Sequence, residues 1–334
     1  MGDIQDETCA FERSQFDNQN HPLVMSTMYS AAALVTTVLN SLILISIWKT
    51  PSLHKPSYTL IGSLALSDFL VGAIGEPLMV ILNIAALKCW SKNIFCIVLK
   101  STTCVVFAFS TISLVTLTFI GLDSLLAVKL RNRYQSVVTK KRVFYALLTV
   151  WIISWVLPAS LFDKLSSNDT AFIPLVLSVD ILALFLVITI TVCYSMSFYS
   201  LRKITSFSVS PSVQNADAGA RPSSNIDVAK YRKSLTTMFV VFIFTILFYA
   251  PFIRTLLAFA VTADQQLSSL LSCLASELIG LLNSAMNPLL YLWRIRNIRE
   301  AVKTTVKTAI KYFKIFYQTA RGQFMIYWTC KHLR

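Results

Sequence analysis

Seven apolar segments, each long enough to cross a lipid bilayer, constrain the fold of this chain more than any other feature. A hydrocarbon layer of roughly 30 Å needs about 20 apolar residues of helix, and only helices or closed barrels satisfy their backbone hydrogen bonds there. Single polar residues interrupt the segments, and short loops join most of them. The segments are Met28–Trp48, Tyr58–Ala85, Ile97–Val128, Val143–Phe162, Phe172–Leu201, Leu235–Val261 and Leu267–Trp293. The sequence therefore predicts a single all-α membrane bundle of seven helices.

Composition and charge agree with a membrane protein. Hydrophobic residues make up 55% of the chain, and the mean hydropathy is +0.63. The net charge of +14 suggests a nucleic-acid partner at first, but the basic residues gather in the loops on one side of the predicted bundle. The N-terminal segment is acidic, with Asp3, Asp6, Glu7, Glu12 and Asp17 against Arg13. The positive-inside rule then places the N-terminus outside the plasma membrane and the basic loops at the anionic inner leaflet, with no role for nucleic acid.

The chain divides into three parts on this interpretation. Residues 1–27 form an extracellular segment, residues 28–293 form the bundle, and residues 294–334 form a cytoplasmic amphipathic helix and tail. In 294–317, lysines alternate with apolar and aromatic residues, a pattern suited to a helix that lies on the lipid bilayer. A solvated helix is the alternative.

Polar residues inside the apolar segments point to function, because polar groups at bilayer depth are costly. The first segment contains Asn40, the second contains Leu64-Ala-Leu-Ser-Asp68, and the third ends with Asp123-Ser-Leu125. The seventh closes with Asn283-Ser-Ala-Met-Asn-Pro-Leu-Leu-Tyr291, in which a proline kinks the helix and nearby asparagines can satisfy the freed carbonyl.

This set of residues, in this order, resembles the rhodopsin-like (class A) G-protein-coupled receptors over roughly residues 26–307. The resemblance implies a cell-surface receptor that binds an extracellular ligand and signals through a heterotrimeric G protein or arrestin, and that is not an enzyme. It also implies a sodium pocket between the second, third and seventh helices, formed by Asp68, Ser113, Asn283 and Asn287. One carboxylate among neutral oxygens suits a hard cation. A neutral, protonated Asp68 held by the same hydrogen bonds is the alternative, and no other cofactor is expected.

The resemblance assigns activation motifs to a set of residues, two of which depart from the family pattern. Ser124 replaces the arginine of the usual Asp-Arg-Tyr, and Tyr249 replaces a tryptophan in the sixth helix. A serine is too short and uncharged to contact a G protein as that arginine does. The full set is Asn40, Asp123, Ser124, Tyr194, Tyr249, Pro251, Asn287, Pro288 and Tyr291.

Two alternatives to a signalling receptor follow from these departures. One is a protein with the receptor fold that acts as a decoy or binds a partner membrane protein without activating G proteins. The other, a small transporter, is disfavoured because the intramembrane polar residues follow the receptor pattern and no proton relay or catalytic pair is present.

The outer face departs from the family in its cysteines. A short, cysteine-free second outer loop and a fifth helix without proline are similar to melanocortin receptors. Cys9, Cys89, Cys96 and Cys273 fall on the oxidising side, where they allow three connectivities or remain partly reduced. Cys89–Cys96, within one loop, is the closest pair and the expected bond.

Ligand and glycosylation sites are expected on the same side. The ionisable groups near the outer helix ends carry mixed signs, which suits a peptide or a small zwitterion. Val106 stands where amine receptors place an aspartate, so the resemblance argues against a monoamine. The expected pocket residues are Glu76, Val106, Arg254 and Glu277, and the single glycosylation sequon is at Asn168.

Overall fold

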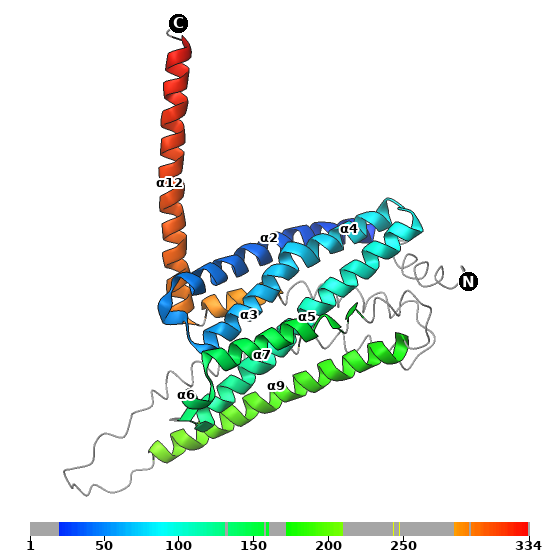
Figure 1. Cartoon of the computed structure of the whole chain (residues 1–334), viewed down its shortest axis with the longest axis vertical. Coiled ribbons are helices and arrows are strands. Elements are labelled where there is room, and N and C mark those ends of the chain that lie inside the picture. The colour runs from blue at the N-terminus through cyan, green and yellow to red at the C-terminus, as the bar shows by residue number, and fades with distance from the viewer. Residues whose placement is uncertain are drawn as a thin grey trace, which may run out of the picture.

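The computed structural model describes residues 20–130, 133–156, 158–159, 172–209, 243, 247, 284–293 and 295–332 (Figure 1). Nearly all of the sixth predicted segment, Leu235–Val261, and the first part of the seventh lie outside these residues. The predicted extracellular segment 1–27 is described only from residue 20.

The first two apolar segments form long antiparallel helices. α2 spans Asn20–Lys49, and a 3₁₀ turn, η1 (Pro51–Leu53), follows it. The second segment is a continuous rod of α3 (Pro56–Leu70), a π-helical turn η2 (Val71–Gly75) and α4 (Glu76–Leu87). Pro56 occupies the first helical position of α3, where the missing proline N–H costs no hydrogen bond.

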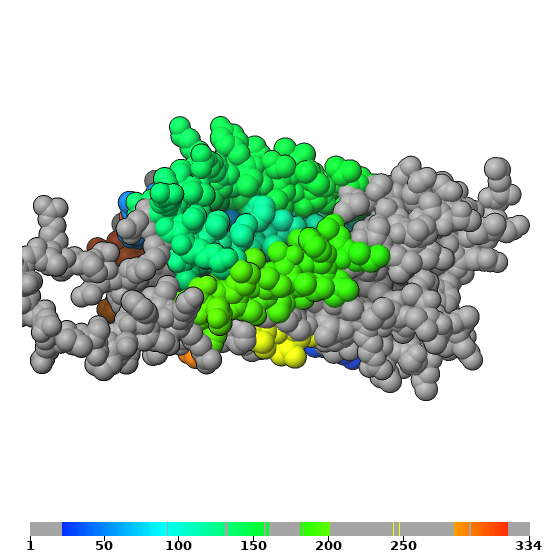
Figure 2. All heavy atoms as spheres, turned by 90° about the horizontal axis from the view of Figure 1, so that it is seen from below, coloured from blue at the N-terminus to red at the C-terminus, as the bar shows by residue number. Residues whose placement is uncertain are grey.

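The next segments cover the other side of this pair. α5 spans Lys92–Leu130 and is followed by the short α6 (Tyr134–Val137) and by α7 (Lys140–Ile153). Thr139 caps α7, since its side chain accepts a hydrogen bond from the Arg142 backbone N–H. α9 spans Phe172–Val209 and packs along α5. Figure 2 shows α7 and α9 on either side of α5 on one face of the molecule.

Three of the described helices are long and apolar enough to cross a membrane: Pro22–Lys49, Pro56–Leu87 and Asn93–Leu130. Their outer surfaces remain apolar, with large exposed side chains such as Leu34, Ile97 and Leu122. An apolar exterior of this extent suits a lipid environment and not water. The core lies between the helices and includes Ile43, Leu64, Leu117, Ile190 and Tyr291.

α12 (Arg296–His332) follows the helical residues 284–293 and runs crosswise to the bundle helices (Figure 1). Its first turns pack against the C-terminal end of α2, where Ser46 Oγ donates to Thr305 Oγ1 at 3.0 Å. This helix extends well beyond the amphipathic stretch 294–317 that the sequence predicts.

Candidate functional site

Asp68 lies in the middle of the bundle and is fully withdrawn from solvent, with 0% exposure. Ser113 Oγ of α5 donates to Asp68 Oδ1 at 3.1 Å, and Asn287 Nδ2 of the seventh helix donates to Asp68 Oδ2 at 2.9 Å. The structure therefore brings together three of the four residues predicted for a sodium pocket. The fourth, Asn283, lies outside the described residues.

Two members of this cluster were not predicted from the sequence, Ser67 and Ser284, and the Ser284 side chain also hydrogen-bonds Asp68. Ser67 Oγ lies 2.8 Å from Ser113 Oγ and is also fully buried. Its position next to Asp68 was the available signal, because a hydroxyl inside an apolar segment needs a polar partner.

The chemistry of this cluster fits a monovalent hard cation. A buried carboxylate needs a compensating charge or a proton, and no lysine or arginine among the described residues pairs with Asp68. The oxygens of Asp68, Ser113 and Ser67 are the ligand type that hard cations prefer. The residues present are thus compatible in kind with the predicted sodium ion.

Asn40 connects the first helix to the seventh. Its Nδ2 donates to the Thr36 carbonyl at 2.9 Å and to the Ser284 carbonyl at 3.3 Å. Both carbonyls belong to helices that pack against the rod carrying Asp68. Asn40 therefore links the first and seventh helices beside the candidate pocket.

The π-helical turn η2 separates Asp68 from a second buried acid, Glu76. Eight residues of ideal α-helix would rotate Glu76 by about 80° from Asp68, and a π turn absorbs roughly one extra residue. Glu76 therefore lies close to the same face of the α3–η2–α4 rod as Asp68. Thr36 Oγ1 donates to Glu76 Oε1 at 3.3 Å, while Glu76 Oε2 is buried and has no hydrogen-bond partner among the described residues.

Two residues of the predicted ligand pocket lie near this turn. Glu76 is only 3% exposed and is directed toward α2. Val106 of α5 lies beside Gly75, with its Cγ2 3.5 Å from the point that a Cβ on the glycine would occupy. Arg254 and Glu277 lie outside the described residues, so the pocket as a whole stays a prediction.

Near the C-terminal end of α5, Asp123 is held by two hydroxyl groups. Ser57 Oγ donates to Asp123 Oδ2 at 2.7 Å, and the Tyr134 hydroxyl donates to Asp123 Oδ1 at 2.5 Å. The Ser124 hydroxyl donates to the Ile120 carbonyl, one turn earlier in the same helix, at 2.9 Å. The structure thus provides hydroxyl partners for Asp123 on α3 and α6, which the sequence analysis did not identify.

The remaining motif residues are partly described. Tyr194 and Tyr291 are both buried in the core, and within the described part of the chain the Tyr291 hydroxyl has no hydrogen-bond partner. Gly121 makes room for Tyr194, whose ring lies 3.5 Å from the position of an added Cβ. Pro288 is also buried. Tyr249, Pro251 and the predicted glycosylation site Asn168 lie outside the described residues.

The predicted disulfide Cys89–Cys96 is wrong. Cys89 is a free, exposed thiol, whereas Cys96 is disulfide-bonded. Cys89 follows the end of α4 by two residues and has a left-handed conformation with φ of 49°, and Cys96 lies one turn inside α5. A disulfide needs Cβ atoms about 3.5–4.5 Å apart, and the sequence separation within a loop does not provide that geometry.

Comparison with known proteins identifies relatives over most of the chain. Adenosine receptor A3 from Ovis aries is 27% identical over 296 residues, which is 83% of this chain and 87% of the relative. Sphingosine 1-phosphate receptor 1 from Danio rerio is 29% identical over 272 residues, covering 78% of this chain and 72% of the relative. Trace amine-associated receptor 1 from Macaca mulatta is 25% identical over 319 residues, covering 84% and 87%.

Residues 39–291 match the 7 transmembrane receptor (rhodopsin family). This range includes the sixth predicted segment and all but the last two residues of the seventh. The match confirms the resemblance inferred from the motifs and the all-α fold of seven membrane helices. It also confirms that the protein is not an enzyme, because the members of this family are receptors. The chain belongs to the rhodopsin family of seven-transmembrane receptors.

Proposed function

We propose that this multi-pass, cell-surface G-protein-coupled receptor is regulated by a sodium ion at Asp68 and couples weakly to G proteins. The observation that carries the proposal is the pair of polar clusters on α5. One joins Asp68, Ser113 and Asn287 in the middle of the bundle, and the other holds Asp123 at its inner end.

Sodium binding is supported by the burial of Asp68 and by its donor set. Asp68 hydrogen-bonds α5 through Ser113 and the seventh helix through Asn287, so its charge affects how three helices pack. A cation held there favours the arrangement in which these helices are close. A change that separates the three helices would lose part of the binding energy of the ion. Sodium binding is therefore coupled to the conformational state of the receptor.

Weak coupling is supported by the environment of Ser124. Its hydroxyl is bonded to the Ile120 carbonyl and carries no charge toward the cytoplasm. An arginine anchor buried in an interface can contribute about 2 kcal/mol or more, which corresponds to at least about a tenfold difference in affinity. A protein without this anchor forms a weaker complex with the transducer.

The same observation favours the second candidate function, a receptor that binds a ligand or a partner membrane protein without activating G proteins. In that case Asp123 and its hydroxyl partners stabilise one helix arrangement, and no transducer contact is needed. Family membership gives no support to the transporter alternative.

For the ligand we propose a peptide or a small zwitterion that enters from the side of the N-terminus, which we place outside. The mixed charges predicted near the outer helix ends support this class. The relatives carry the names of adenosine, sphingosine 1-phosphate and trace-amine receptors, and these ligands differ from one another. A ligand screen should therefore measure binding and not signalling, because Ser124 can silence the response.

Nucleotide exchange on a panel of G proteins, measured with the purified receptor in nanodiscs, tests the coupling. We expect weak basal exchange, and we expect Ser124→Arg to raise it by about tenfold or more. Ser136→Arg is the matched control, since Ser136 is an exposed inner-face serine bonded to the Arg133 carbonyl. Strong exchange by the unaltered receptor that Ser124→Arg leaves unchanged contradicts the proposal, and exchange by neither protein favours the non-signalling candidate.

A further inference from the structure

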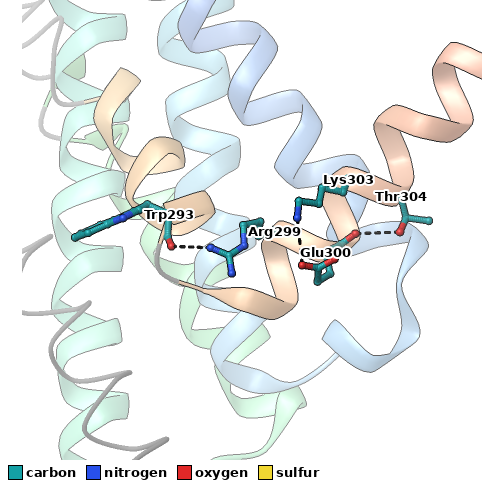
Figure 3. A network of polar contacts seen from close by, with 5 residues as sticks. All are labelled: Trp293, Arg299, Glu300, Lys303 and Thr304. Atoms are coloured by element: carbon teal, nitrogen blue, oxygen red, sulfur yellow. Dashed lines mark hydrogen bonds and ion pairs between the residues drawn. The ribbon is translucent and has the colours of Figure 1, made fainter.

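The four acidic side chains that the structure describes differ in how their charge is compensated. Glu300 of α12 is exposed and pairs with Lys303 at 3.4 Å (Figure 3). Asp68 and Asp123 each accept hydrogen bonds from at least two side chains. Glu76 is buried but accepts one hydrogen bond among the described residues. Of these four side chains, Glu76 therefore has the least compensation for a negative charge.

The carboxyl group of Glu76 lies between the α3–η2–α4 rod and α2. Its Oε1 accepts the Thr36 hydroxyl, and its Oε2 is buried without a hydrogen-bond partner in the described part of the chain. An ionised carboxylate is costly to bury unless it is paired, and such a group takes up a proton instead. Protonation at Oε2 leaves the contact with Thr36 intact, because that hydroxyl donates to the other oxygen. The geometry therefore suits a carboxyl group that holds a proton.

A chain of hydrogen bonds joins Glu76 to Asp68 through α2 and the seventh helix. Thr36 contacts Glu76 through its hydroxyl, and its backbone carbonyl accepts from Asn40 Nδ2. The same Asn40 nitrogen donates to the Ser284 carbonyl, and the Ser284 side chain hydrogen-bonds Asp68. Because every step is a direct contact, a change of charge at one acid acts on the polar groups that hold the other.

Asp68 is the charged group that acts on Glu76 among the described residues. The helices packed against η2 and α4 are α2, α3 and α5. α2 presents Thr36 to Glu76, and α5 presents Val106 to the same turn, and neither side chain titrates. The titratable groups nearest to these two residues in sequence are Tyr29, Lys100 and Cys104.

The separation of the two acids sets the strength of their interaction. Glu76 follows Asp68 by eight residues, which is about 12 Å along a helix. At this distance, one charge in a protein changes a binding equilibrium at the other by about tenfold. A negative charge on Asp68 opposes ionisation of Glu76, and a sodium ion at Asp68 cancels that charge. The effect is reciprocal, so a proton on Glu76 weakens sodium binding by the same factor.

We propose, on the basis of the sodium site proposed above, that Glu76 binds a proton in competition with sodium at Asp68. Uptake of sodium breaks the O–H bond of the Glu76 carboxyl group. The electron pair stays on the carboxylate, and the proton passes to the solvent. The receptor therefore binds sodium more tightly as the pH rises.

Sodium titrations of thermal stability at two pH values test this proposal on the full-length receptor in nanodiscs. We expect the sodium concentration that gives half of the stabilisation to be up to about tenfold lower at about pH 8.5 than at about pH 6. Glu76→Gln should keep the sodium response and lose its pH dependence, because glutamine keeps the acceptor for Thr36 but does not titrate. Thr36→Val is the matched control, since it removes the hydroxyl and leaves the carboxyl group, and it should keep the pH dependence.

Three outcomes of the titrations contradict the proposal. A pH dependence that survives Glu76→Gln overturns it, because the competing proton then belongs to Asp68. The same half-point at both pH values in the unaltered receptor also overturns it. If the unaltered receptor shows no sodium response at either pH, the sodium site itself is wrong, and the competition is wrong with it.

Infrared spectra provide a second measurement that does not depend on the stability of Glu76→Gln. In the difference between sodium and choline spectra, we expect sodium to remove the carbonyl stretch of a protonated carboxyl group. Thr36→Val should shift this band, because the Thr36 hydroxyl donates to the Glu76 carboxyl group. A carboxyl band that sodium leaves unchanged, or that Thr36→Val does not shift, overturns the proposal.

Discussion

Replacement of Gly72 by alanine should separate α2 from the rod that carries Asp68. Gly72 lies in the π-helical turn η2, where the backbone of α2 approaches closely. A Cβ at this position would lie 2.8 Å from Thr37 Oγ1, 2.9 Å from Thr36 Cβ and 2.9 Å from the Thr37 backbone nitrogen. Side-chain rotation can relieve the first contact but not the contact with the backbone, so α2 itself must move.

The expected cost follows from two opposing terms. Forcing an extra methyl group into a packed interface costs about 1–3 kcal/mol. Replacing glycine by alanine inside a helix returns roughly 0.5–1 kcal/mol, because the unfolded chain loses less freedom. The free energy of unfolding should therefore fall by about 1–2 kcal/mol. The shift of α2 should also lengthen the hydrogen bond between Thr36 and Glu76.

Gly62 provides the matched control on the same rod. A Cβ at this position meets nothing within 4 Å, so Gly62→Ala should stabilise the protein by about 0.5–1 kcal/mol. Thermal unfolding of the purified receptor in one detergent compares the two variants, and Gly72→Ala should unfold at the lower temperature. If Gly72→Ala proves as stable as Gly62→Ala, the close approach of α2 to η2 is not part of the native structure.

Three further substitutions test the two ends of the bundle. Tyr134→Phe removes the hydroxyl that donates to Asp123 and should lower the free energy of unfolding by about 1–2 kcal/mol, since hydrogen bonds to charged groups exceed the average. An unchanged unfolding temperature would show that Ser57 alone satisfies the carboxylate. Cys96→Ser should cost about 2–4 kcal/mol through the lost disulfide, whereas Cys89→Ser should stay within about 0.5 kcal/mol. If both variants lose the same stability in thermal unfolding, the result would instead support a Cys89–Cys96 bond.

Helix identity could be predicted from the sequence better than helix length. Apolar length predicted the first three membrane helices. The predicted second segment starts at Tyr58, whereas α3 begins at Pro56, whose fixed φ angle suits the first helical position. The predicted first segment starts at Met28, but α2 already starts at Asn20. Hydropathy locates the hydrocarbon layer, while a helix continues through the interface as long as its backbone bonds are kept. The same reason explains the underestimated length of α12.

The resemblance to class A receptors implied that Asp68, Ser113 and Asn287 meet between the second, third and seventh helices. The cost of a carboxylate and amides at bilayer depth agrees with this grouping, because such groups need polar partners. Ser57 and Tyr134 carried no such signal. Serine and tyrosine are common at helix ends, and only the packing of α3, α5 and α6 brings their hydroxyls to Asp123. The prediction of the Cys89–Cys96 disulfide was wrong for a related reason. Pairing depends on the distance and direction between two Cβ atoms and not on loop length.

The sodium dependence of thermal stability tests the proposed regulation most directly. The purified receptor is unfolded at increasing sodium chloride concentrations, with choline chloride keeping the ionic strength constant. We predict that sodium raises the unfolding temperature and that Asp68→Asn abolishes this rise. Asp123→Asn, which changes a control carboxylate near the C-terminal end of α5, should preserve it. A sodium response that survives Asp68→Asn, or no response in the unaltered receptor, would contradict sodium binding at Asp68.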